Sequence, residues 1–208
     1  KKNLDMAIQS TNKLAELANK LIEFQKEELY SSSINVNKCE LNAYLQDFIK
    51  QFQPYAAKKN INFTYKGTNE NLTVWIDRNK IDSILHNLVS NALKYTPDNG
   101  SVSICLQNNA THWLLNISDT GIGISANDQK RLFKHLFRGN NAINLQITGS
   151  GIGLVHTYKL IKRHQGEITV TSKENEGTTF SLRFPIDSKQ YIHHSEPSIQ
   201  PTANNFIY

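Results

Sequence analysis

One stretch after Asp77 constrains the fold most, because its apolar residues follow a helical period without interruption. They recur at offsets of 3, 4, 7, 8, 11 and 12 positions from the first. The members of the series are Ile81, Ile84, Leu85, Leu88, Val89, Ala92 and Leu93. Such a helix must bury one whole face, so the sequence predicts an amphipathic helix packed on a core.

The same helix carries a polar stripe of Asn87, Asn91 and Lys94. At about 100° per residue, its centre lies roughly 140° from the apolar centre. Taken alone, the stripe is most simply solvated surface. It also suits a magnesium-bridged polyphosphate, because a carboxamide offers a neutral oxygen to a hard cation and a lysine neutralises phosphate charge.

Alternating strands and further helices are predicted around this helix. Pro54 is expected to disturb the helical pattern through Leu45, Phe48, Ile49 and Phe52. The expected strands are 61–65, 72–76, a hairpin of 102–107 with 113–118, and 166–172 with 178–185 joined at Glu176-Gly177; a short helix is expected around 131–137 and another up to about His164.

The two ends differ from the middle. Residues 1–30 have no Gly or Pro and predict a long amphipathic helix. Its wide apolar band favours a bundle or dimer partner, although packing on its own domain remains open. A polar linker at 31–37 follows, and from Ser188 the chain has few aliphatic residues, as a linker or tail does. We therefore divide the chain into 1–34, 35–187 and 188–208.

Composition sets wider limits. With 208 residues, 38% of them hydrophobic, we expect one principal domain. The absence of a long apolar run, the start without Met, and two cysteines without metal or disulfide spacing favour an excised cytoplasmic piece of a longer protein. The net charge of +5 admits nucleic acid, an anionic membrane or a phosphate-rich ligand, but the basic residues are scattered.

Two glycine motifs point to a nucleotide. Asp119 ends a predicted strand and is followed by Gly121 and Gly123, where a flat ring can approach and the carboxylate can accept from an amine. A lone DTG is often only a turn. The second motif, GSGIGL at 149–154, opens a helix whose N-terminus favours phosphate, and it lacks the continuations of a dinucleotide fold or a P-loop.

Five motifs then occur in a fixed order: NLVSNALKYTP, DTGIGI, RLFKHLFRG, GSGIGL and GTTF. They resemble the N, first glycine, F, second glycine and third glycine boxes of the histidine kinase catalytic domain, in the ATPase superfamily of gyrase and the Hsp90 chaperones. The resemblance covers about residues 35–186. It implies an α/β (α+β) two-layer sandwich, with a mixed β-sheet covered on one face by helices and ATP held under a mobile lid.

The resemblance also implies roles on the phosphate side. Asn87 and Asn91 face Mg²⁺ and the phosphates, and Lys94 and Tyr95 lie beside the phosphates. Arg138 reaches the terminal phosphate. A glutamate at the position of Asn87 activates water in gyrase-like members, whereas a carboxamide is no general base. We therefore expect a kinase with slow hydrolysis, in which Asn87, Lys94 and Arg138 act catalytically.

On the adenine side, the resemblance implies that Asp119 accepts from the adenine amine and that Gly121 and Gly123 shape the adenine wall. Thr179 supports this end through a water. The resemblance further implies that Gly149, Gly151 and Gly153 form the lid hinge and phosphate turn, and it places Leu154 among the nucleotide-binding residues.

The first 30 residues resemble the second helix of the family's dimerisation and phosphoacceptor domain. None of the seven histidines has the acceptor context of a following acidic residue and Arg-Thr-Pro. We therefore expect ATP binding without autophosphorylation of this piece alone. The implied partners are the chain's own dimerisation domain, in a homodimer, and a response regulator receiver domain, which hybrid sensors carry in the same chain.

Two other functions stay open. A degenerate domain that binds nucleotide, or nothing, could serve only as a signalling scaffold, although all the expected positions are filled. A basic nucleic-acid binder needs clustered Lys or Arg interleaved with aromatic residues, and the sequence shows no such cluster.

Overall fold

A five-stranded mixed sheet forms one layer of the domain in the computed structural model, which describes residues 11, 34–68, 71–134 and 151–187. The strand order is β2-β4-β5-β7-β6, with β2 and β4 parallel and the other pairs antiparallel. The strands are β2 (Asn62–Lys66), β4 (Ser101–Asn108), β5 (His112–Asp119), β6 (Glu167–Lys173) and β7 (Gly177–Pro185). A separate antiparallel pair joins β1 (Asn37–Glu40) to β3 (Thr73–Ile76).

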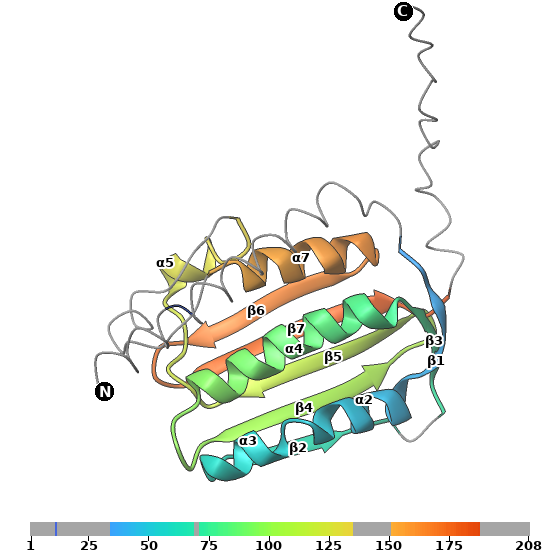
Figure 1. Ribbon diagram of the computed structural model, residues 1–208. Helices are drawn as coiled ribbons and strands as arrows, with labels where there is room; N and C mark the ends of the chain where they lie inside the picture. The colour runs from blue at the N-terminus through green and yellow to red at the C-terminus, as the bar shows by residue number, and fades with distance from the viewer. Residues whose placement is uncertain (1–10, 12–33, 69–70, 135–150, 188–208) are drawn as a thin grey trace, which may run out of the picture.

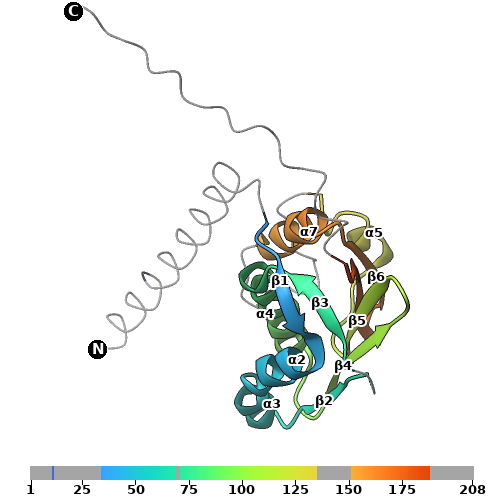
Figure 2. The same ribbon diagram turned by 90° about the vertical axis from the view of Figure 1, so that its right-hand side faces the viewer.

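Helices cover one face of this sheet and form the second layer (Figures 1 and 2). They are α2 (Leu41–Lys50), α3 (Gln53–Lys58), α4 (Arg78–Tyr95) and α7 (Gly153–Arg163), with the short α5 (Ala126–Gln129) near one end of α7. Figure 2 shows α2, α3, α4 and α7 on one side of the sheet, whereas α5 lies beside the edge strand β6. The predicted two-layer α/β sandwich is confirmed.

The core forms where the apolar face of α4 meets the sheet. All seven residues of the predicted series on α4 are buried, which confirms the helical period as the organising pattern. Alternate residues of β4, β5 and β7 point toward the helices, and Trp113 stacks on Phe184 with ring centroids 4.4 Å apart. Burying each large side chain contributes about 2–3 kcal/mol, so this interface dominates the stability of the fold.

Three local features differ from the predicted pattern. The helical pattern is interrupted before Pro54, as expected, because α2 ends at Lys50, but a further helix, α3, follows with Pro54 in its first turn, where its missing N–H costs nothing. Of the short helix expected at 131–137, residues 131–134 form a turn and 135–137 lie outside the described residues; α5, which Ser125 caps, precedes it and was not expected. The strand β1 was not expected, because its four residues are too few to show alternation.

The remaining strands and α7 match the predicted ranges closely, including the turn before β7. The long helix predicted at 1–30 and the tail from 188 lie outside the described residues, apart from Thr11.

A buried junction around Asp77 ties the start of α4 to the end of α7. The Asp77 carboxylate accepts from the backbone N–H of Asn35 (3.0 Å), from the N–H of Lys80 (3.3 Å) and from Lys80 Nζ (3.2 Å). Its own N–H donates to Nε2 of the fully buried His164 (3.3 Å), whose Nδ1 donates to the Leu160 carbonyl (2.9 Å). Burial lowers the pKa of His164, in keeping with a neutral ring in this arrangement.

The Asp77 carboxylate should therefore stabilise the fold in its ionised form. Burial alone raises the pKa of Asp77, but the hydrogen bonds from Asn35 and Lys80 and the charge of Lys80 lower it below 3.8 overall. A lowered pKa in the folded state gives stability that is present above the unfolded pKa and lost as pH falls through the folded pKa.

We predict that Asp77→Ala lowers the free energy of unfolding by about 2–4 kcal/mol at pH 7, because it removes a helix cap and leaves a buried lysine without its carboxylate. Urea unfolding measures this, and the deficit should shrink below about pH 4. Asp47→Ala is the matched control: its pair with Lys50 is also three residues apart, but the two side chains are 76% and 65% exposed. An equal effect of both substitutions would contradict the prediction.

Candidate functional site

The polar stripe of α4 lies at the rim of the helical layer, half-buried. Asn91 Nδ2 donates to Asn87 Oδ1 (3.4 Å), and Asn87 Nδ2 donates to Thr157 Oγ1 of α7 (2.8 Å). Lys94 Nζ lies 5.0 Å from the ring centroid of Tyr95. The carboxamides are thus ordered by neighbours on two helices, and the stripe is not the freely solvated surface that its sequence alone would allow.

The second glycine motif meets the stripe at Asn87. Gly153 is the first residue of α7, and a Cβ there would lie 2.3 Å from Asn87 Oδ1, so a larger residue would displace the Asn87 carboxamide from its present position. Gly151 has a φ of +75° in the turn before α7. Leu154 is half-buried and packs against the hydrophobic core, which fixes the first turn of α7.

The first glycine motif contacts Tyr95, the last residue of α4, beyond the Lys94 end of the stripe. Asp119 is the last residue of β5, as predicted, and its Oδ1 accepts from the N–H of Gly121 (2.8 Å). A Cβ on Gly121 would lie 2.6 Å from the Tyr95 carbonyl oxygen, and the N–H of Ile122 donates to that oxygen (3.3 Å). Gly123, at φ +64°, lies against the Lys173 carbonyl.

Three sequence motifs therefore converge along one helix edge. Asn87, Asn91 and Tyr95 follow each other at four-residue intervals, which is one line of an α-helix about 12 Å long. Gly153 contacts its beginning and the loop after Asp119 contacts its end. The structure brings together residues that the sequence separates by more than 60 positions.

Asp119 is the most electrostatically perturbed carboxylate of this site. Burial raises the pKa of Asp119 to about 6, and backbone hydrogen bonds from Gly121 and Thr178 lower it only in part. A desolvated carboxylate is a strong acceptor for a fixed N–H donor, because water does not compete for it.

Thr178, which the sequence analysis did not single out, lies beside Asp119. The two residues are paired in the β5–β7 register, and Thr178 is 6% exposed. Thr179 points to the opposite face, where its Oγ1 donates to Ser118 Oγ (2.9 Å), so the structure does not bring Thr179 to Asp119. The alternation of side chains along β7 could have predicted this: Phe180 is a core residue, and Thr178, two residues earlier, lies on the same face of the strand.

Two predicted residues, Arg138 and Gly149, lie outside the described residues. Among those described, no three His, Cys, Asp or Glu side chains gather as a metal cluster. The oxygen donors that the stripe offers to a cation are carboxamides.

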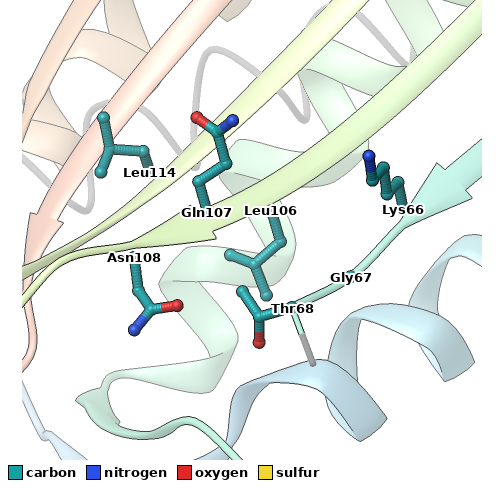
Figure 3. A pocket seen from close by; sticks show the side chains of 7 residues that line it. All are labelled: Lys66, Gly67, Thr68, Leu106, Gln107, Asn108 and Leu114. Carbon is teal, nitrogen blue, oxygen red and sulfur yellow. The ribbon is translucent and has the colours of Figure 1, made fainter. Parts of the chain in front are cut away.

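A hollow of about 440 Å³ lies at the far end of the sheet (Figure 3). Its lining is Lys66, Gly67, Thr68, Leu106, Gln107, Asn108 and Leu114. Asp119 pairs with Val102, at the other end of β4 from Leu106, and no predicted site residue lines the hollow. It is therefore separate from the site along α4.

Comparison with known proteins places this arrangement in a family. Residues 76–188 match the family described as histidine kinase-, DNA gyrase B-, and HSP90-like ATPase. Histidine kinase P4 of Formosa agariphila is 31% identical over 85% of this chain and 13% of its own length, and sensor histidine kinase WalK of Bacillus subtilis is 30% identical over 86% and 30%. The catalytic domain of histidine kinase ThkA superposes with a TM-score of 0.65, at 28% identity, over 74% of this chain and 97% of that domain.

The chain belongs to the family of histidine kinase-, DNA gyrase B- and HSP90-like ATPases, since the match spans more than half of its 208 residues. Its fold is that of the histidine kinase catalytic domain. The chain spans 13% and 30% of the length of the two curated relatives given above. Within the part of the chain that the structure describes, no helix is both long and apolar enough to cross a bilayer.

The raised pKa of Asp119 predicts an unusual dependence of stability on pH. The folded state holds the proton more tightly than the unfolded state, so the ionised carboxylate destabilises the fold above about pH 6 and has no such effect below pH 3.8. Asp119→Asn should therefore raise the free energy of unfolding at pH 7, by up to about 3 kcal/mol, since one pKa unit corresponds to about 1.4 kcal/mol.

Denaturant unfolding between pH 4 and 8 measures this difference, which should fade as pH falls from 6 to 4. Asp98→Asn, at an exposed carboxylate of the turn after α4, is the control and should change little at any pH. A less stable Asp119→Asn at pH 7 would show that Asp119 serves the fold rather than a ligand.

Proposed function

We propose that residues 35–187 form a catalytic domain that binds Mg-ATP along α4 and presents it for phosphoryl transfer to a histidine. The observation that carries this proposal is the convergence of the carboxamide stripe, Gly153 and the Asp119 loop on one helix edge. The family, which is described as ATPases, supports ATP as the ligand. The named relatives, which are histidine kinases, support a histidine as the acceptor.

The side chains fit a purine nucleotide at the Asp119 end. Asp119 is desolvated and faces a loop in which Gly121 allows close approach, so the carboxylate suits an exocyclic amine. Gly123 completes the wall of this proposed subsite, and Thr178 adds a second backbone donor to Asp119. We retain Thr179 only as a support of β7 next to Ser118.

Along the rest of α4, from Asn87 onward, the side chains suit phosphate groups and a hard cation. Asn87 and Asn91 offer carboxamide oxygens for Mg²⁺, and Lys94 and Tyr95 lie one turn further along the same edge. Gly151, Gly153 and Leu154 set the turn into α7, whose N-terminal N–H groups suit phosphate oxygens. Arg138 and Gly149 belong to the same proposal by their motifs.

The proposed reaction transfers the γ-phosphoryl group of ATP to an imidazole nitrogen, with ADP as the leaving group. Asn87 has no basicity to activate water, so the domain should favour transfer over hydrolysis. Positioning and charge neutralisation by Lys94, Arg138 and Mg²⁺ would supply most of the catalysis.

The acceptor histidine is proposed to lie on a dimerisation domain, of which residues 1–34 would be the second helix and linker. The intact protein is then proposed to be a homodimeric sensor histidine kinase on the cytoplasmic side of a membrane. We propose a response regulator receiver as its next partner, with 188–208 as a linker toward a receiver in the same chain. The two curated relatives named above, a histidine kinase and a sensor histidine kinase that are both longer than this chain, support this organisation.

Titration with a fluorescent ATP analogue, with and without Mg²⁺, tests the binding proposal. We predict Mg²⁺-dependent binding that Asn91→Ala and Asp119→Asn each weaken about tenfold or more, because each removes a buried polar contact or its charge. Asn62→Ala, an exposed carboxamide on β2, is the control. A folded wild-type protein without affinity for the analogue would favour a scaffold, and salt-sensitive binding of an oligonucleotide would favour a nucleic-acid binder.

Phosphoryl transfer is tested by adding a separate dimerisation domain that carries an acceptor histidine. We predict that radiolabel from γ-labelled ATP appears on the acceptor and not on this chain, since none of its histidines has the acceptor sequence. Asn91→Ala should abolish the label. A set of acceptor domains from several sensor kinases, all left unlabelled by a chain that binds Mg-ATP, would contradict the kinase activity.

A further inference from the structure

The end of α4 is held by an unusual set of partners. The last four carbonyl groups of an α-helix have no N–H donor within the helix, so they need donors from elsewhere. Here the Ala92 carbonyl accepts from the N–H (3.1 Å) and the Oγ1 (2.6 Å) of Thr96, and the Tyr95 carbonyl accepts from the N–H of Ile122 (3.3 Å). The carbonyls of Leu93 and Lys94 lie between these two positions.

A single side chain from another helix serves the remaining carbonyls. Lys59 Nζ donates to the carbonyl oxygens of Leu93 (2.9 Å) and Lys94 (3.5 Å), and also to that of Thr96. Lys59 caps α3 and is half-buried, and its own carbonyl accepts from the N–H of Asn99 (3.0 Å) in the turn after α4. One ammonium group, with its three protons, thus closes the C-terminus of α4 from 34 to 37 residues away.

This cap acts on the part of α4 that carries the proposed phosphate side. Lys94 and Tyr95 occupy the last turn, and the ends of helices fray more readily than their middles. Asp119 is held separately by the β5–β7 pairing. The N–H of Ile122, in the loop after Asp119, donates to the Tyr95 carbonyl and so joins the two halves of the site; at 3.3 Å this bond is longer than a typical backbone bond.

We propose that Lys59 is a positioning residue for the nucleotide: its ammonium group clamps the last turn of α4 so that Lys94 and Tyr95 keep a fixed place relative to Asp119. Lys59 contacts none of the predicted ligand-binding side chains and acts through backbone carbonyls. A cation at a helix C-terminus is also favoured by the helix dipole, so the clamp is electrostatic as well as hydrogen-bonded. The inference rests on the proposed nucleotide site.

The competing explanation is that Lys59 only stabilises the fold. A purely structural lysine would lower the unfolding temperature when replaced, but the protein that remains folded would bind nucleotide with unchanged affinity. A positioning lysine would change the affinity of the fully folded protein. Affinity measured well below the unfolding transition therefore separates the two roles.

The test compares Lys59→Met with Lys58→Met, which removes a neighbouring exposed ammonium from the last turn of α3. Wild type and Lys58→Met should bind the Mg²⁺ complex of the fluorescent ATP analogue equally. Lys59→Met should raise the Kd by about fivefold or more, as expected for coupling between a remote group and a site. Lys59→Arg should restore most of the affinity, since it keeps the charge and the donors.

Two further measurements make the outcome specific. Adenosine binding, which depends on the Asp119 end, should weaken less than binding of the triphosphate. Amide hydrogen exchange at Ile122 should accelerate in Lys59→Met, because its acceptor becomes mobile. If Lys59→Met does not fold, Lys59→Gln, which keeps two donors without the charge, replaces it.

Unchanged affinity in a folded Lys59 variant, or equal weakening by Lys58→Met, would overturn the inference. That result differs from a failure of the proposed function, in which the wild-type protein itself would not bind the analogue.

Discussion

The packing of the apolar face of α4 against the sheet is the interaction on which the rest of the structure depends. Seven side chains of one helix are buried in a common core, so the rotation of α4 about its axis has one stable value. Because the helix cannot turn without exposing that face, its opposite edge is equally fixed. The positions of Asn87 and Asn91 on this edge are thus set by hydrophobic contacts that they do not themselves make, and their hydrogen bonds then orient the carboxamides.

The second requirement is that the neighbouring loops approach this edge closely, and glycines provide the space. The start of α7 meets Asn87 at Gly153, and the loop after β5 meets the Tyr95 carbonyl at Gly121. These contacts lie at opposite ends of one line of α4. A ligand along this line would touch three elements that a rigid core already positions, which is how preorganised sites are built.

The two buried carboxylates near the ends of α4 differ in how far the fold compensates their charge. Asp119 is desolvated at the end of β5, and its raised pKa shows that the fold does not compensate its charge fully. By contrast, Asp77 at the beginning of α4 is buried among donors that lower its pKa. The two carboxylates lie near opposite ends of one helix, and the fold compensates the charge of Asp77 but not that of Asp119.

Local sequence determined the elements and their motifs. The period of α4 and the alternation of β4, β5 and β7 follow from neighbouring residues, so both were predicted correctly. The helix α3 and the strand β1 were not predicted, because a proline can begin a helix as well as end one, and four residues are too few for a period. Only the tertiary structure decided that Thr178 lies beside Asp119, that Lys59 closes α4, and that burial raises the pKa of Asp119. These features depend on contacts between distant segments and on the exclusion of water, and neither exists until the chain has folded.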